Sequence, residues 1–454
     1  MENYNSIIIG FGKGGKTLAG TLASKGFKVA LIEKSEMMYG GTCINVGCIP
    51  SKSLILSGEI VSNQDIDFSK KETLYKKAII KKRNLTSALR EKNFKKLDDL
   101  NNVTIYNGEA SFKSDTEIKI ENNNETTVIS GDRIFINTGS TPNIPSIKGI
   151  KNNPHVYTSD KLMDLDNLPK NLVVIGGGYI GLEFASMYSN FGSNVTVIQH
   201  SGVFLKKEDK DIADAIKENL KSQGVSFIFN CETESIVEKD NRTLLNLKIN
   251  GKNKEIEADG VLIATGRLPN TSSLKCENAG VELTERGAIK VDSNLRTTAK
   301  NIWAMGDVVG KLQFTYTSLD DYRVILSQVY GDKSYDLTKR ENIPFSVFLS
   351  PPYAKVGLSE KEAIKQGYNI KVGKLLTNNI PKAKVLGIST GLLKAIINVD
   401  NNKILGAALF TPDAHEVINI IKLVIDEGLE YTVLRDKIFT HPTMTESLND
   451  LFNI

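Results

Sequence analysis

The sequence predicts an α/β protein with two similar βαβ domains and a separate α+β domain at its C-terminal end. Two observations predict this fold class: a glycine-rich turn follows an apolar strand at both Gly10 and Gly176, and the pattern of elements changes after about residue 343. A chain of 454 residues is also too long for one hydrophobic core. We expect the first domain in residues 1–150 and again in 271–340, the second in 151–270, and the third in 341–454.

The composition excludes several classes of protein. A net charge of +4 in a chain of this size predicts no nucleic-acid partner. Four cysteines do not make the disulfide framework of a secreted domain, and we expect no metal site. The chain begins without a charged and apolar leader and holds no apolar run long enough to span a bilayer. We therefore expect a cytosolic protein with no membrane partner.

The first βαβ unit has every part of a dinucleotide-binding fingerprint. The parts are a strand at residues 6–9, the glycines Gly10, Gly12 and Gly15, a helix to about Ser24, and a strand at 28–32 that leads into Glu33. The glycines allow backbone N–H groups to approach a pyrophosphate, and the acid at the end of the second strand accepts from ribose hydroxyls. A strand before, a helix after and an acid at the right distance make this signal strong.

The same turn also matches a competing motif. Residues 10–17 fit G-x-x-x-x-G-K-T, the phosphate loop of ATPases and GTPases, with Lys16 on the phosphates and Thr17 on magnesium. That interpretation leaves Glu33, the cysteine pair described below and the second glycine turn unexplained. We therefore favour the dinucleotide interpretation.

The pattern repeats later in the chain. A strand at 171–175, the glycines Gly176, Gly178 and Gly181, a helix at 182–191 and a strand at 195–198 precede Gln199. Here an amide replaces the acid, and His200, Lys206 and Lys207 follow. The absence of a carboxylate together with nearby cationic groups tolerates a 2′-phosphate, which favours NADPH over NADH. If His200 and the lysines only face solvent, the site takes either cofactor.

In each copy of the pattern, antiparallel strands and a further apolar strand follow the βαβ unit. Residues 54–100 have helical spacing, and 103–112, 117–121 and 126–130 are expected to form antiparallel strands before a strand at 133–137 and Thr138-Gly139. In the second copy, antiparallel strands at 225–256 precede a strand at 260–264 and Thr265-Gly266-Arg267. A third short apolar strand, after both copies, closes on Gly306-Asp307. The C-terminal elements are expected at 345–349, 359–366, 392–399, 404–410 and 414–427.

A cysteine pair lies just after the first βαβ unit. The segment runs from Gly41 and Thr42 through Cys43 and Cys48 to Lys52. A single helical turn would place the two sulfurs on one face, near enough for a bond. Such a pair shuttles between dithiol and disulfide if one sulfur is a stabilised thiolate, although a fixed disulfide or two buried thiols fit the spacing too. We expect Cys231 and Cys276 to be structural thiols.

Near the C-terminus His441 precedes Glu446 by five residues. A carboxylate at this distance can orient a histidine into an acid/base dyad. The alternative is a surface helix start with Pro442 at its first position and Glu446 exposed.

Together these residues resemble the flavoprotein pyridine nucleotide-disulfide oxidoreductases, which include glutathione reductase, dihydrolipoamide dehydrogenase and mercuric reductase. The resemblance implies bound FAD and a nicotinamide, two Rossmann-like domains and a C-terminal dimerisation domain. It implies an FAD site at Gly10, Gly12, Gly15, Glu33, Gly41, Thr42, Thr138, Gly139, Gly306 and Asp307. It implies a nicotinamide site at Gly176, Gly178, Gly181, Glu183, Gln199, His200, Gly266 and Arg267.

The catalytic roles also follow from the resemblance. Cys43 and Cys48 would form the redox-active disulfide, with Cys43 as the interchange thiol that attacks substrate. Cys48 would face the flavin as a stabilised thiolate, with Lys52 close to the flavin. His441 and Glu446 would serve the disulfide of a second subunit, which implies a homodimer.

Within the family, residues 10–19 and 38–48 are similar to the bacterial reactive-chlorine-resistance flavoproteins, which reduce hypothiocyanous acid. We therefore expect a small oxidised sulfur compound as substrate. The final residues contain no cysteine pair, unlike mercuric reductase, and Gln199 stands where dihydrolipoamide dehydrogenase carries an acid. Reduction of glutathione or another small disulfide, reduction of Hg(II) or Cu(II), and a redox-sensing role stay as alternatives.

Overall fold

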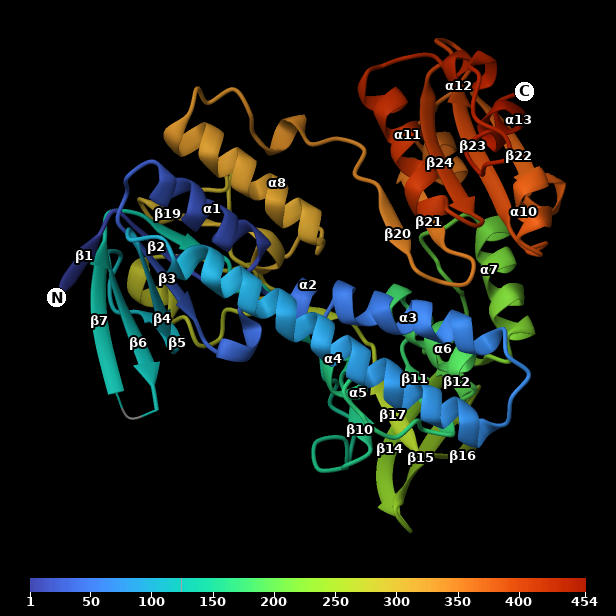
Figure 1. The fold of residues 1–454 in the computed structure, drawn as a ribbon, viewed down its shortest axis with the longest axis horizontal. Coiled ribbons are helices and arrows are strands. Elements are labelled where there is room, and N and C mark those ends of the chain that lie inside the picture. Colours follow the sequence, from blue (N-terminus) through green and yellow to red (C-terminus); the bar gives the residue numbers. More distant parts are fainter. Residues whose placement is uncertain (124) are drawn as a thin grey trace.

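The computed structural model describes residues 1–123 and 125–454. Figure 1 shows three bodies: one built on the N-terminal strands, a second built on the strands around β11, and the C-terminal domain above the second body. The long helices α3 (Cys48–Ser62) and α4 (Phe68–Asp98) cross from the first body to the second. The mixed α/β fold class predicted from the sequence is confirmed.

The first body contains a five-stranded parallel sheet. Its strands, in spatial order, are β19 (Ile302–Ala304), β8 (Ile134–Ile136), β2 (Ser6–Ile9), β3 (Val29–Glu33) and β4 (Val103–Asn107). Helices α1 (Lys13–Ser24) and α8 (Thr315–Ile325) pack side by side beside this sheet. The inner strands β2, β8 and β3 are largely apolar and buried because both faces of a parallel sheet are covered, whereas the edge strand β4 is only partly buried.

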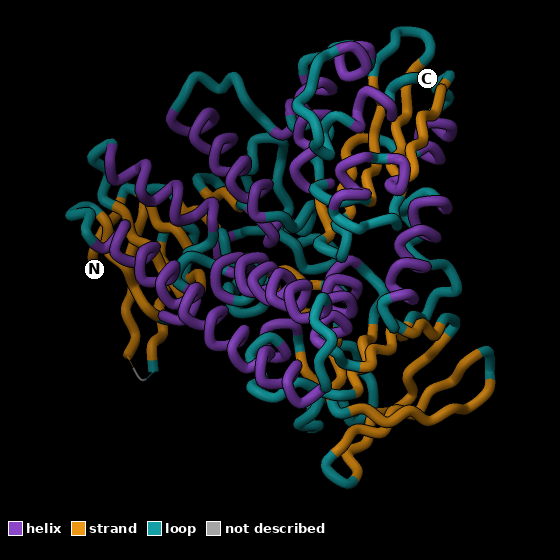
Figure 2. The backbone as a smooth tube through the Cα atoms, turned by 45° about the vertical axis from the view of Figure 1, so that its right-hand side comes forward, coloured by secondary structure: helices purple, strands orange, loops and turns teal. Residues whose placement is uncertain are grey.

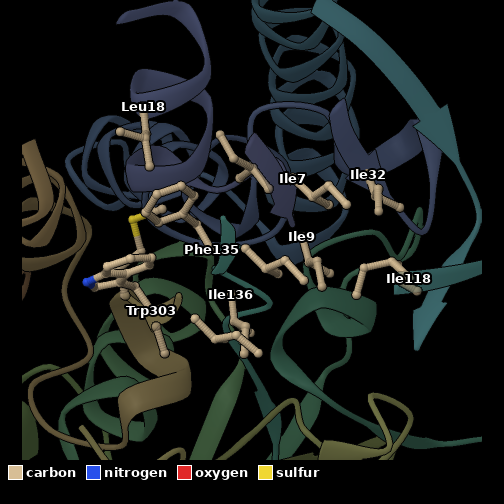
Figure 3. Close-up of a cluster of buried hydrophobic side chains, with 14 of the residues drawn as sticks. Ile7, Ile9, Leu18, Ile32, Ile118, Phe135, Ile136 and Trp303 are labelled. Carbon is tan, nitrogen blue, oxygen red and sulfur yellow. The ribbon is translucent and has the colours of Figure 1, made fainter. Parts of the chain in front are cut away.

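The core of this body is a continuous apolar cluster (Figure 3). Ile7, Leu18 and Phe135 are fully buried, and the rings of Phe135 and Trp303 stack with centroids 5.3 Å apart. This packing holds the ends of β2, β8 and β19 in fixed relative positions. The carboxyl ends of these strands carry the glycine turn, Asn137 and Gly306, so the core sets the geometry of the ligand edge.

A second, smaller sheet corrects one prediction. Residues 103–112 do not form one antiparallel strand, because Gly108 has φ = 148° and divides them. The first half, β4, extends the parallel sheet, and only the second half pairs in antiparallel fashion. The small sheet has the order β1 (Glu2–Tyr4), β7 (Glu125–Gly131), β6 (Glu117–Asn122) and β5 (Glu109–Phe112).

The second body has the same plan as the first, and one of its strands also differs from the prediction. Its parallel sheet has the order β10 (Val156–Tyr157), β17 (Gly260–Ile263), β11 (Asn171–Ile175), β12 (Asn194–Ile198) and β13 (Ser226–Ile228). Strand β13 was expected in the antiparallel group but runs parallel to β12 at the sheet edge. The antiparallel sheet holds β14 (Cys231–Lys239), β15 (Arg242–Ile249) and β16 (Lys252–Ala258), and it projects from the molecule in Figure 2.

Helices of the second body connect it to its neighbours. They are α5 (Ser159–Leu162), α6 (Tyr179–Phe191) and α7 (Lys210–Ser222), and α7 was not predicted. Helix α6 is buried along most of its length and packs against α3. A two-stranded sheet of β9 (Ser140–Pro142) and β18 (Arg267–Pro269) also joins the first two bodies.

The C-terminal domain is an antiparallel sheet with helices. Its strands, in spatial order, are β20 (Phe345–Val347), β21 (Tyr353–Gly357), β24 (Ile404–Phe410), β23 (Leu392–Asn398) and β22 (Ile370–Leu376). Its helices are α9 (Glu360–Lys365), α10 (Pro381–Val385), α11 (Ala414–Asp426), α12 (Thr432–Asp436) and α13 (Ser447–Leu451). The sequence did not predict β21 and β22. Within residues 1–123 and 125–454, no helix has the length and apolar character needed to cross a membrane.

Candidate active site

The first glycine turn forms a cradle in which side chains do not fit. A Cβ atom at Gly12 would lie 2.5 Å from Asn137 Oδ1, and one at Gly41 would lie 2.7 Å from the Cα of Gly12. Cβ atoms at Gly10 and Gly15 would overlap backbone carbonyl oxygens. The cysteine segment is therefore pressed against the fingerprint turn. A flat, backbone-lined edge at the start of a helix suits a pyrophosphate.

Asn137 is a structural member of this edge that sequence reasoning missed. Its Oδ1 accepts from the Gly15 N–H at 2.9 Å, and its Nδ2 donates to the Met305 carbonyl at 2.8 Å. It thus ties the glycine turn to the end of β19. Its position directly before Thr138-Gly139 is the only sequence signal that could have indicated it.

Glu33 lies at the end of β3 with its carboxylate directed back to the turn. Its Oε2 accepts from the Phe11 N–H at 3.0 Å, and its Oε1 accepts from the Ser35 N–H at 3.3 Å. Burial raises its pKa above the usual value for a glutamate. This is the position at which an acid accepts from ribose hydroxyls in a dinucleotide fold.

The phosphate-loop alternative does not fit these contacts. The Lys16 ammonium donates to the Gly40 carbonyl at 3.2 Å and to Asn93 Oδ1 at 2.6 Å, and the Thr17 hydroxyl donates to the Lys13 carbonyl at 2.6 Å. Both side chains that would hold a triphosphate and its metal are thus committed to the protein.

The two cysteines do not lie on one continuous helix, which corrects the expected single turn. Cys43 lies in α2 (Thr42–Asn45), while Cys48 is the first residue of α3. The chain breaks at Gly47, where a Cβ would lie 2.9 Å from the Thr42 carbonyl oxygen. Both are free thiols in this structure, and Cys48 is the more exposed residue. The start of a helix favours a thiolate at Cys48, because the dipole is positive there.

The two thiols differ strongly in acidity. A hydrogen bond from Cys48 lowers the pKa of Cys43 to about 6, and Thr315, Lys16 and Lys52 add to this effect. The pKa of Cys48 is raised, first by the same hydrogen bond and then by burial. These hydrogen bonds and charges favour the thiolate at Cys43, whereas the start of helix α3 and the resemblance both favour it at Cys48. Thr315, whose Oγ1 lies 3.9 Å from Cys48 Sγ, was not identified from the sequence.

Lys52 lies one turn after Cys48 and forms an ion pair between the first two bodies. Its Nζ lies 2.7 Å from Glu183 Oε2 and 4.5 Å from the centre of the Phe348 ring. The other oxygen of Glu183 accepts from the Phe348 N–H at 2.8 Å. Both carboxylate oxygens of Glu183 are thus engaged by protein groups, and its position orients Lys52.

The second glycine turn repeats the cradle. Cβ atoms at Gly176 and Gly181 would overlap backbone carbonyl oxygens, whereas Gly178 has open space beside it. Gln199 lies against this turn at Gly177, and its Nε2 donates to the Val203 carbonyl at 2.6 Å. His200, Lys206 and Lys207 are all exposed.

The remaining predicted residues meet where the first two bodies join. Arg267 Nε donates to Ser140 Oγ at 2.8 Å, and Ser140 Oγ donates to Asp307 Oδ2 at 2.8 Å. Burial raises the pKa of Asp307, and the Ser140 hydrogen bond opposes that rise. Asn270 contacts both residues of the first Thr-Gly pair: Thr138 Oγ1 donates to its carbonyl, and its N–H donates to the Gly139 carbonyl. The Gly266 carbonyl accepts from the Asn143 N–H. The Gly306 N–H donates to the Asp321 carboxylate.

His441 and Glu446 form a direct pair on the surface of the C-terminal domain. The distance between His441 Nδ1 and Glu446 Oε2 is 2.7 Å, and the histidine side chain is 68% exposed. Helix α13 begins only at Ser447, so Pro442 is not at the first position of a helix, as the alternative required. The exposed imidazole makes no hydrogen bond to a cysteine of its own chain among those described. No group of three metal-ligating side chains occurs in the described part of the chain.

Comparisons with known proteins cover nearly the whole chain. The model of the pyridine nucleotide-disulphide oxidoreductases matches residues 4–321, and the model of their dimerisation domain matches residues 343–452. The probable pyridine nucleotide-disulfide oxidoreductase RclA of Escherichia coli (strain K12) is 47% identical over 454 residues, with both chains fully covered.

More distant relatives carry other activities in their names. A mercuric reductase of Staphylococcus aureus is 33% identical over 98% of this chain and 81% of its own length. A dihydrolipoyl dehydrogenase of Chlamydia muridarum is 34% identical over 98% of this chain and 95% of its own length.

The fold is matched equally well by solved structures. A Cu(II) complex of the HOCl-induced flavoprotein disulfide reductase RclA from Escherichia coli superimposes with a TM-score of 0.94. It is 46% identical, and the match covers 100% of this chain and 99% of that chain.

Proposed function

The chain belongs to the pyridine nucleotide-disulphide oxidoreductases, and from this premise we propose that it reduces hypothiocyanous acid to thiocyanate with NADPH. The observation that carries the proposal is the Cys43–Cys48 pair, which follows Gly41 directly against the glycine turn at Gly12. A hydrogen bond from Cys48 lowers the pKa of Cys43 to about 6, and the same hydrogen bond raises the pKa of Cys48. Such a pair presents a nucleophile and a proton donor to a small electrophile at neutral pH.

The two glycine turns supply suitable cradles for FAD and a nicotinamide, the cofactors of this family. We assign FAD to Gly10, Gly12, Gly15, Glu33 and Gly41, because a Cβ would fill this edge and Glu33 faces the turn. We assign the nicotinamide dinucleotide to Gly176, Gly181 and Gln199, because Cβ atoms at both glycines would overlap carbonyl oxygens and Gln199 lies against the turn. Gly178, which has open space beside it, is assigned from its place in the fingerprint. When bound, these groups supply the electron pair that opens a Cys43–Cys48 disulfide.

The cysteines then carry out the chemistry on the substrate. The Cys43 thiolate attacks the sulfur of hypothiocyanous acid, so that a Cys43–S–SCN bond forms and hydroxide leaves. Cys48 gives its proton to the hydroxide, and its sulfur attacks Cys43 Sγ and releases thiocyanate. The two sulfurs lose two electrons to the oxidant, and the products are thiocyanate, water and the disulfide.

His441 and Glu446 would hold a proton for this step in a second subunit. Glu446 orients the ring through Nδ1, which leaves Nε2 for the reacting sulfur. The dimerisation domain and the exposure of His441 support a homodimer in which this pair serves the partner subunit's disulfide. We place the reaction in the cytosol, where a nicotinamide donor is available.

The lack of an acid at Gln199 supports NADPH over NADH, because a carboxylate there would repel a 2′-phosphate.

Purified holoenzyme tests the substrate in a panel of steady-state NADPH oxidations. Hypothiocyanous acid should give the highest kcat/KM, ahead of oxidised glutathione, lipoamide, Hg(II) and Cu(II). A higher value for either metal ion would favour the second candidate, metal reduction, which the Cu(II) complex of the Escherichia coli relative motivates. A disulfide at the top of the ranking would instead make the protein a disulfide reductase.

A further inference from the structure

Lys16 occupies a position in the first helix that the dinucleotide fingerprint does not account for. It follows Gly15, the last glycine of the turn, and its ammonium reaches the cysteine segment rather than a phosphate. It donates to the Gly40 carbonyl at 3.2 Å and to Asn93 Oδ1 at 2.6 Å. Gly40 lies three residues before Cys43, so the charge is anchored just before helix α2, which carries this thiol.

Two cations beside the cysteine segment are not paired with a carboxylate of the described residues. Among residues 1–123 and 125–454, no carboxylate oxygen lies within 4.0 Å of the Lys16 ammonium, and none lies that close to Arg90. Arg90 also faces this segment, because its Nε donates to Asn45 Oδ1 at 2.8 Å. Lys52 differs, because Glu183 at 2.7 Å neutralises it. Lys16 is thus a cation held against the cysteine segment by neutral oxygens alone.

We propose that Lys16 is a positioning residue for Cys43: its ammonium, held by the neutral oxygens of Gly40 and Asn93, stabilises the Cys43 thiolate that attacks the oxidant. The proposal rests on the proposed function for the identity of the oxidant, but not for the state of the thiol. It also gives a role to the lysine that created the phosphate-loop match in the sequence.

The acidities of the two groups agree with this geometry. Lys16 and Lys52 both lower the pKa of Cys43, and the Cys43 thiolate in turn opposes the fall in the pKa of Lys16. Burial and the neighbouring Lys13 and Lys96 lower the pKa of Lys16 to about 8. The thiolate and the ammonium therefore coexist between about pH 6 and pH 8. Cys48 and Thr315 also bear on Cys43, through hydrogen bonds that a change at Lys16 leaves in place.

The test measures the state of Cys43 without its oxidant. Holoenzyme reduced with NADPH is alkylated with iodoacetamide across a pH series, and the labelled cysteine is identified by peptide mass. Lys16→Met should raise the midpoint, the pH at which Cys43 is alkylated at half its maximal rate, by roughly half a pH unit or more, because a nearby positive charge is lost. Lys16→Arg should restore most of the shift. Lys25→Met removes an exposed charge from the end of the same helix and should leave the midpoint unchanged.

Asn93→Asp provides a second variant if Lys16→Met loses its flavin. It places a carboxylate on the Lys16 ammonium with little change in shape, and it should move the midpoint upward as well. An unchanged midpoint in a yellow, folded Lys16→Met protein, or in Asn93→Asp, overturns the proposal. If the midpoint moves but no variant and no wild-type sample reduces hypothiocyanous acid, the proposed function fails while the role of Lys16 stands.

Discussion

Lys52 Nζ lies 2.7 Å from Glu183 Oε2, and this ion pair joins the helix that follows the cysteines to the helix that follows the second glycine turn. Glu183 is nearly buried and also accepts from the Phe348 N–H. The pair thus connects the redox segment, the nicotinamide fingerprint and the start of the C-terminal domain at one point.

Glu183→Gln should lower the free energy of unfolding by about 1–3 kcal/mol, because Lys52 is left half-buried without its counter-ion. Urea unfolding followed by flavin fluorescence measures the change. Glu218→Gln is the matched control, because its partner Lys221 lies 3.0 Å away on the exposed face of α7, and its loss should cost below about 1 kcal/mol. Equal costs for the two variants would show that the Glu183 pair has no special role.

The reactivity of Cys43 should depend on pH with a midpoint near pH 6. The pKa of this thiol is lowered to about 6, so protonation below that pH removes the nucleophile and deprotonation above it restores the full rate. Alkylation rates of the reduced enzyme measure the profile. Cys276 serves as an internal control, because burial raises its pKa to about 11 and it should stay unlabelled over the same range. A midpoint near that of a free thiol would contradict the assigned environment.

Mixed dimers should show whether His441 serves the partner subunit. Cys43→Ser and His441→Ala homodimers should each be nearly inactive. After subunit exchange, the mixed dimer regains one complete site from the intact cysteine and the partner's intact histidine. Random pairing should therefore restore about a quarter of wild-type activity. A mixture that stays inactive although exchange is demonstrated would place both groups on one subunit.

Gln199→Glu should shift the cofactor preference towards NADH. A carboxylate at this strand end accepts from the ribose hydroxyls and repels a 2′-phosphate. The ratio of kcat/KM for NADPH to kcat/KM for NADH should fall by about tenfold or more. The same ratio in both proteins would show that Gln199 does not face the ribose.

The local parts of the fold were predictable because they depend on short-range chemistry. Both glycine turns and their strands and helices follow from spacing along the chain. The family was identified by the resemblance of these motifs, and the comparisons confirm it. Strands β4 and β13 were misplaced because a short apolar run has no periodicity that distinguishes a parallel edge strand from an antiparallel one. Strands β21 and β22 were missed because their pairing is set by partners that lie elsewhere in the C-terminal sheet.

The site was predictable in its residue types but not in its contacts. Three residues from distant parts of the sequence reach the site only through the tertiary fold. Asn137 contacts the first glycine turn, Thr315 contacts Cys48, and Phe348 contacts Glu183. The order of acidity within the cysteine pair depends first on the hydrogen bond between the two thiols and then on burial, with Thr315 as a contact from a distant part of the sequence. Residue spacing alone contains none of these distances.

NADPH oxidation by wild type and by Cys43→Ser, with thiocyanate measured as the product of hypothiocyanous acid, tests the central claim most directly. The wild type should form one thiocyanate for each NADPH consumed. The variant should keep its yellow flavin and lose this turnover, because the attacking sulfur is absent. A variant that retains full turnover, or a wild type that consumes NADPH without forming thiocyanate, would contradict the account.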